Sequence, residues 1–136
     1  MIDLDYKPED SDYWSTPYNA PEKWGLKIIG SLGDPNACYS FDDLIVWRHD
    51  SGVIFWATDS GCSCPSPFED VKSLRDLTLL EAKDWDIFSE AVKQHCTPYN
   101  YVEKKDGTGY ETVYDYEGDP QAADKTQLLQ KVSALL

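Results

Sequence analysis

The sequence predicts an α+β domain: an antiparallel β-meander packed with helices, followed by a second β-hairpin and a C-terminal helix. Changes in the apolar period along the chain indicate this class. The period is two over residues 26–58, becomes helical over residues 66–95, and returns to two over residues 99–116. A chain of 136 residues can bury one core, so we expect residues 1–136 to form a single domain.

The first 24 residues form an acidic, aromatic segment that should lie against the body as an irregular arm. Three prolines, at positions 8, 17 and 21, exclude a long helix there. The arm also carries four large rings that can be buried: Tyr13, Trp14, Tyr18 and Trp24.

Three strands are predicted next, at residues 26–32, 39–49 and 53–58, separated by turn signals at residues 33–36 and 50–52. The second turn contains Gly52 and is short enough for a tight hairpin. Apolar side chains alternate onto both faces of the middle strand, so we expect the sheet to be covered on both sides there.

Two capping patterns predict the helices that follow. Ser66-Pro67-Phe68-Glu69 is a capping box with proline at the first helical position, which predicts a short helix to about Leu74. Thr78 to Glu81 repeats the pattern and predicts a longer helix to about His95, with its apolar stripe packed on the sheet.

Pro98 ends this helical region, and strands at residues 99–103 and 110–116 form the second hairpin around a glycine-rich turn. Asp119 with Pro120 is expected to cap a last helix that runs to Leu136.

The most distinctive string of the sequence lies between the meander and the helices. It concentrates half of the cysteines, and its residues are Asp59, Ser60, Gly61, Cys62, Cys64, Pro65, Ser66, Pro67, Phe68 and Glu69. The Asp-Ser-Gly start could form a turn whose N–H groups hold an anion, but Asp and Ser in such turns usually bind their own backbone. We expect a structural corner.

With residues 13–15, 25–26, 39–42, 46–48 and 52, this string resembles a family of small uncharacterised proteins encoded mostly by tailed phages of actinobacteria. The resemblance covers roughly residues 12 to 80. It implies a cytoplasmic setting in an infected bacterium, and it brings no activity, cofactor or catalytic residue.

The charge disfavours two classes of partner. There are 25 acidic and 12 basic residues, a net charge of -13, which repels nucleic-acid phosphates and anionic lipids. No apolar stretch reaches the roughly 20 residues needed to span a bilayer, and the N-terminus is acidic where a signal peptide would be basic. We therefore expect a cytoplasmic protein without direct nucleic-acid or membrane binding.

The four cysteines, Cys38, Cys62, Cys64 and Cys96, are expected to be free thiols without a bound metal. A zinc-stabilised module that uses Cys62 and Cys64 with His95 and Cys96 is the alternative, because thiolate and imidazole suit tetrahedral zinc. The single residue between Cys62 and Cys64 is shorter than usual zinc spacings, which argues against it. If one thiol is reactive, Cys64 is favoured by its place before a predicted helix start.

An enzyme is not expected. The chain has only two histidines, His49 at a strand end and His95 at a helix end, and each has a routine structural role there. Adjacent carboxylates are common in a chain this acidic, so they do not indicate catalysis.

The aromatic residues favour protein binding instead, because Tyr and Trp are enriched at interface hot spots. The candidate binding residues are Tyr13, Trp14, Tyr110, Tyr114 and Tyr116, with core packing of these rings as the alternative. The predicted function is that of a non-enzymatic phage accessory protein that binds a host or phage protein. An acidic DNA mimic that occupies a basic nucleic-acid site is a further alternative.

Overall fold

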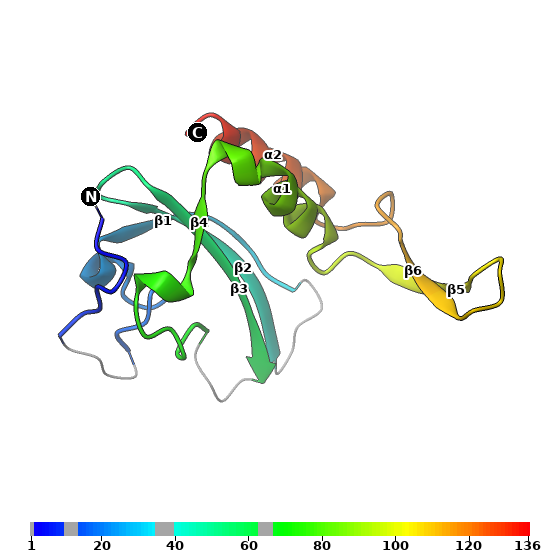
Figure 1. Ribbon diagram of the computed structural model, residues 1–136, viewed down its shortest axis with the longest axis horizontal. Helices are drawn as coiled ribbons and strands as arrows, with labels where there is room; N and C mark the ends of the chain where they lie inside the picture. Colours follow the sequence, from blue (N-terminus) through cyan, green and yellow to red (C-terminus); the bar gives the residue numbers. More distant parts are fainter. Residues whose placement is uncertain (1, 10–13, 35–39, 63–66) are drawn as a thin grey trace.

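The computed structural model describes residues 2–9, 14–34, 40–62 and 67–136, and it confirms the α+β class. A four-stranded antiparallel sheet of order β1-β2-β3-β4 forms the centre of the body (Figure 1). Its strands are β1 (Leu26–Leu32), β2 (Ser40–His49), β3 (Ile54–Cys62) and β4 (Thr78–Leu80). Helices α1 (Trp85–Gln94) and α2 (Ala122–Ser133) lie together on one side, and strands β5 (Tyr99–Glu103) and β6 (Tyr110–Tyr114) form a separate hairpin.

The long hairpin β2–β3 forms the centre of the meander. Its register runs from Ser40 opposite Cys62 to Arg48 opposite Ile54. The predicted tight turn is present, with Gly52 at a φ of 93°, a value that glycine adopts without steric cost. Strand β3 continues four residues beyond the predicted end at Thr58, so the Asp59-Ser60-Gly61 string belongs to the strand and does not form a turn of its own.

The sheet is buried on both faces, as the alternation along β2 predicts. Leu44 and Val46 belong to a core shared with Phe88 and Val92 of α1 and with Val132 of α2. The neighbouring side chains Ile45 and Trp47 belong to a second core on the opposite face, together with Trp24, Phe55, Phe68, Leu74 and Leu77. The stripe predicted on the long helix therefore packs on the sheet.

Helix α2 approaches the sheet closely at Gly30 of β1. A Cβ atom at Gly30 would collide with the Cδ1 atom of Leu128. The register of β1 against β2 also shifts between Ile28 and Gly30. The absence of a side chain at this position lets the helix sit on the edge strand.

The N-terminal segment covers the second face. The indole N–H of Trp24 donates to Ser15 O at 2.7 Å, and that of Trp47 donates to Pro17 O at 3.0 Å. The N–H of Arg75 donates to Leu4 O at 2.7 Å, which ties residues 2–9 to the segment after β3. These bonds satisfy both buried indoles through main-chain carbonyls.

Both predicted helix starts are wrong. Residues 67–70 form a turn in which Phe68 has a φ of 64°, which excludes a right-handed helix from Pro67. Only the 3-10 helix Leu74–Asp76 follows, capped reciprocally by Ser73 and Asp76. The predicted cap Ser66 lies outside the described residues.

Thr78 does not begin a helix, because residues 78–80 form β4, whose main chain pairs with β3. The capping box of the long helix is formed by Glu81 and Asp84 at the 3-10 turn Ala82–Asp84 that leads into α1. The meander thus has four strands where three were predicted. A capping pattern reports only local preference, and the unpaired edge of β3 offered hydrogen bonds that local sequence cannot reveal.

None of the helices in the described parts of the chain combines the length and apolar character that crossing a bilayer requires.

Candidate functional site

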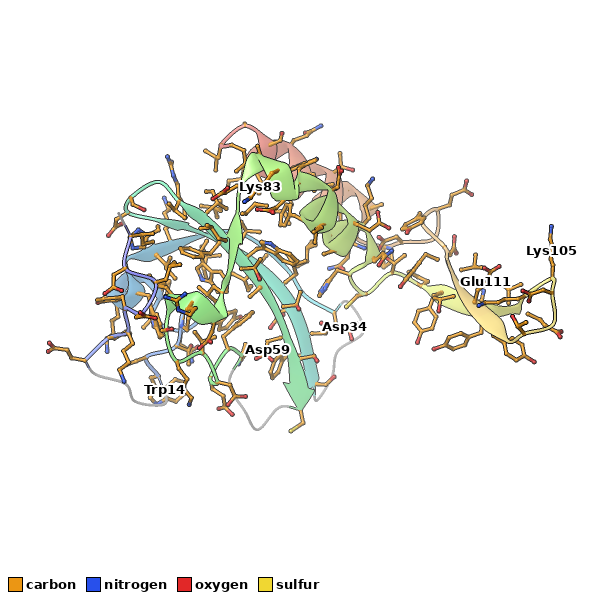
Figure 2. All side chains as sticks on the ribbon, viewed as in Figure 1. Trp14, Asp34, Asp59, Lys83, Lys105 and Glu111 are labelled. Atoms are coloured by element: carbon orange, nitrogen blue, oxygen red, sulfur yellow. The ribbon has the colours of Figure 1, made fainter. Side chains whose placement is uncertain are left out.

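The hairpin β5–β6 projects away from the body, and its side chains extend into open space around it (Figures 1 and 2). It forms a two-stranded sheet of its own, in which Tyr99 pairs with Tyr114 and Glu103 pairs with Tyr110. All five residues of β5 are exposed, and so are four of the five residues of β6. Neither face of this hairpin contributes to the two cores.

The tip of the hairpin is closed by its own hydrogen bonds. Asp106 Oδ1 accepts the Thr108 N–H at 3.0 Å and the Thr108 hydroxyl at 2.7 Å. These two bonds hold the pKa of Asp106 below its ordinary value. Gly107 and Gly109 have φ angles of 73° and 144°, which only glycine adopts without strain. The turn fixes the register and therefore which side chains share a face.

One face of the hairpin carries a continuous row of tyrosine rings. Ring centroids are 5.4 Å apart for Tyr101 and Tyr99, 6.3 Å for Tyr99 and Tyr114, and 5.8 Å for Tyr114 and Tyr116. The side-chain hydrogen bond between Tyr101 and Tyr99, followed by the charge of Tyr99, raises the pKa of Tyr101. Tyr101 is 67% exposed and Tyr110, on the same face, is 69% exposed. The row is held by the register and by ring contacts, and it remains open to solvent.

The root of the hairpin is anchored to both helices. Asp115 N–H donates to Pro98 O at 2.8 Å, which closes the base of the hairpin. Beneath it, the buried Lys125 of α2 donates to Lys93 O at the end of α1 and to the Thr97 hydroxyl, at 3.0 and 2.8 Å. Its third partner is Asp119. The base of the hairpin is therefore held to both helices by hydrogen bonds.

A hollow of about 560 Å³ lies beside this base and meets the end of the tyrosine row at Tyr116. Its walls come from α1 and α2, and they include the side chains of Glu90, Ala122 and Leu129. The ring of Tyr116 thus joins the exposed row to a concave, partly apolar surface.

The predicted binding residues fall in two places. Tyr110, Tyr114 and Tyr116 lie on the hairpin, where Tyr114 is half-buried and Tyr116 is 47% exposed. Trp14 is exposed on the arm, far along the chain from the hairpin, and Tyr13 lies outside the described residues. The arm and the hairpin lie at opposite ends of the molecule in Figure 1.

The candidate residues named from sequence omitted Tyr99 and Tyr101, which complete the row. The signal was present in the alternation Tyr-Asn-Tyr at the start of β5. A register for the hairpin was needed to place Tyr99 directly opposite Tyr114.

In its described part, the distinctive string comprises the end of β3 and a turn at residues 67–70, and Asp59 links the two. Asp59 accepts the N–H of Ser60 at 3.0 Å and the N–H of Phe68 at 2.7 Å. Phe68 is 3% exposed and packs edge-on against Trp47, with centroids 5.2 Å apart. Asp59 thus directs Phe68 into the second core. Pro67 and Glu69, on either side of Phe68 in the chain, are half-buried. Cys64 and Pro65 lie outside the described residues.

Among the described members of the metal set considered as an alternative, His95 and Cys96 lie together and Cys62 is not part of their group. Cys62 is an exposed free thiol at the end of β3, and Cys64 is not described. His95 and Cys96 instead lie beside Asp42 of β2, with one potential ligand atom from each residue within 4.8 Å of the others. Burial, followed by the charges of Asp42 and Asp34, raises the pKa of Cys96 to about 12.

The other histidine is engaged in a turn. The Nδ1 atom of His49 lies 2.8 Å from the Ser51 hydroxyl and accepts the Ser51 N–H at 3.0 Å. These two contacts hold the His49 ring in the turn that joins β2 and β3.

A family model for a domain of unknown function, DUF7574, matches residues 15–117 of the chain. The match spans the arm, the sheet, α1 and the whole β5–β6 hairpin. No curated protein and no solved structure matches the chain.

Proposed function

The chain belongs to the DUF7574 family, and we propose that it is a non-enzymatic phage accessory protein that binds another protein, of host or phage origin, through its β5–β6 hairpin. The phage origin and action in the cytoplasm of the infected cell rest on the resemblance of residues 12–80. The binding role rests on the hairpin itself.

The exposed tyrosine row is the observation that carries the proposal. Rings of Tyr99, Tyr101, Tyr114 and Tyr116 follow one another at 5.4–6.3 Å. Tyrosine presents a large contact area with little side-chain entropy to lose, and it is enriched among interface hot spots. Contiguous exposed apolar surface of this kind marks interaction sites in soluble proteins.

The position of the row supports the same function. An isolated two-stranded hairpin is only marginally stable in water, and this one receives no packing from the body along its strands. A partner that covers the tyrosine face would bury that surface and order the hairpin. The anchored root presents the row in a defined direction and so limits the entropy lost on binding.

The charge of the hairpin indicates the chemistry of the partner. Residues 99–117 contain five carboxylates and two lysines, a net charge of -3. Arginine and lysine side chains pack favourably over tyrosine faces and pair with flanking carboxylates. The partner we propose is a protein surface that combines basic and apolar residues, with an apolar side chain entering the hollow beside Tyr116.

Site-specific crosslinking tests the proposal. A photoreactive amino acid replaces Tyr101, or Ile87 of α1 as the control, because Ile87 is an equally prominent apolar residue at 70% exposure. The full chain is irradiated in infected or expressing cells. We expect the probe at position 101 to crosslink one protein, and the probe at position 87 not to crosslink that protein.

The purified partner is then titrated with three chains: the wild type, the double variant Tyr99→Ala/Tyr101→Ala, and the control Ile87→Ala. Tyr101→Ala with Tyr99→Ala should weaken binding about 30-fold or more, since hot-spot residues contribute at least about 2 kcal/mol. Ile87→Ala should bind as the wild type does, and all three chains should melt at similar temperatures. Binding that survives the tyrosine replacements but collapses in moderate salt would overturn the proposal in favour of an acidic mimic of nucleic acid.

A further inference from the structure

The C-terminal end of α1 and the start of β2 bring together three side chains of different chemistry. Asp42, His95 and Cys96 each place one oxygen, nitrogen or sulfur atom within 4.8 Å of the other two. Cys96 takes a φ of 50°, outside the right-handed helical region, directly after the end of α1. We propose that these three residues form a binding site for a divalent transition-metal ion of the zinc class.

The spacing fits one ion with a small contraction. Zinc bonds of 2.0–2.3 Å in a tetrahedral arrangement separate neighbouring ligand atoms by about 3.3–3.8 Å. His95 Nδ1 lies 4.0 Å from Asp42 Oδ1, too far for a hydrogen bond but close to the distance between two ligands of one ion. Three protein ligands leave the fourth tetrahedral position for solvent or another ligand.

The hydrogen bond of His95 matches that of a metal ligand. Its Nε2 atom lies 3.1 Å from the main-chain oxygen of Asp42, an acceptor, so Nε2 carries the proton. In neutral imidazole, Nδ1 then has its lone pair free and facing the cluster. Metal-binding histidines usually donate their second ring nitrogen to a carbonyl or carboxylate in this way, which fixes the ring orientation. The His95 side chain is 5% exposed, so this orientation is held by packing.

The local charge also favours a cation. Asp42 and Asp34 both act on Cys96, and Asp43 lies close enough to interact with His95. Lys125 is the opposing positive charge that acts on Cys96. A bound dication would offset the carboxylates and displace the thiol proton of Cys96, because coordinating thiols are deprotonated. This site is separate from the tyrosine row and independent of the proposed protein binding.

The test is zinc binding by the full chain, stripped of metal under reducing conditions and titrated against a chromophoric chelator. We expect one zinc per chain. Cys96→Ser, His95→Gln and Asp42→Asn should each weaken binding about 100-fold or more, since even residues that only orient ligands change metal affinity 10- to 100-fold. Cys62→Ser and His49→Gln are matched controls on described residues and should bind as the wild type does.

Cobalt binding to the wild type supplies a measurement that does not depend on the folding of variants, because a coordinated thiolate gives an absorption band in the near ultraviolet. Loss of this band in Cys96→Ser, with the band kept in Cys62→Ser, would then assign it to Cys96. Absence of zinc binding at micromolar concentrations would overturn the proposal. So would equal loss of affinity in Cys62→Ser and Cys96→Ser, or cobalt binding without the thiolate band.

Discussion

Lys125 Nζ and Asp119 Oδ2 lie 2.5 Å apart in an ion pair whose side chains are only 5% and 3% exposed. The pair connects the first turn of α2 to the segment that leads out of the hairpin. Through Thr97 and the main-chain oxygen of Lys93, the same ammonium also reaches the end of α1. A single buried cation therefore joins three segments at the base of the projecting hairpin.

Removal of one member of this pair should be strongly destabilising. Asp119→Ala leaves the Lys125 ammonium buried without its counter-charge, which typically costs about 3–5 kcal/mol in the free energy of unfolding. Asp124→Ala, at an exposed position of the same helix, should change it by less than about 0.5 kcal/mol. Urea unfolding of both variants measures the difference.

A double variant separates the charge from the packing. Asp119→Asn with Lys125→Met should recover much of the loss seen in Asp119→Ala, because it leaves no unpaired buried charge. Equal destabilisation in the single and double variants would show that the ion pair is not the cause.

The same pair predicts a loss of stability in acid. Burial opposes the ionisation of Asp119, but hydrogen bonds from Lys125 and the Gln121 N–H outweigh it, so the pKa of Asp119 is lowered. A lowered pKa contributes stability above the unfolded value of about 3.9, and this contribution is lost as the pH falls through the folded pKa. Urea midpoints measured between about pH 5 and 2 should fall more steeply for the wild type than for Asp119→Asn.

Gly30→Ala should disturb the packing of α2 on the sheet. The added methyl group meets the Cδ1 atom of the buried Leu128, so this side chain must move within the packed core, at a cost of about 1–3 kcal/mol. Ser31→Ala, at the neighbouring exposed position of β1, is the control and should be nearly neutral. Thermal melting of the two variants checks this, and equal melting temperatures would contradict the close approach.

Asp59→Ala should loosen the corner that places Phe68. The variant loses the acceptor of the Phe68 N–H and should cost about 1–2 kcal/mol. Asp70→Ala, exposed in the same segment, should leave stability unchanged. The intrinsic fluorescence of the five tryptophans should also change in Asp59→Ala and not in Asp70→Ala, because Phe68 packs on the Trp47 indole. A change of the same size in Asp70→Ala would contradict the assignment.

The hairpin should open far more often than the central sheet. Its strands pair only with each other, so the amides of β5 and β6 should exchange with solvent on the order of 10-fold or more faster than those of β2. Hydrogen exchange followed by mass spectrometry measures this. If the amides of β5 and β6 were as protected as those of β2 in the purified protein without a partner, another surface would already cover the hairpin.

Local pattern was sufficient for much of this protein. The alternation of Leu44, Ile45, Val46 and Trp47 determined both the strand and its burial on two faces, because side chains of a strand point to opposite sides. The glycine-rich turn after Glu103 likewise determined the second hairpin. Whether its tyrosines were exposed or packed in a core was left open by the sequence.

Tertiary structure decided what depended on partners distant in the chain. Thr78–Leu80 has a helix-start pattern yet pairs with β3, because an open strand edge offers main-chain hydrogen bonds that outweigh a local cap. Phe68 leaves the helical region of φ because Asp59 and the second core hold it. Asp42 joins His95 and Cys96 only when α1 ends beside β2. The sequence by itself thus determined periodicity and turns, and the packing of distant segments decided which side chains meet.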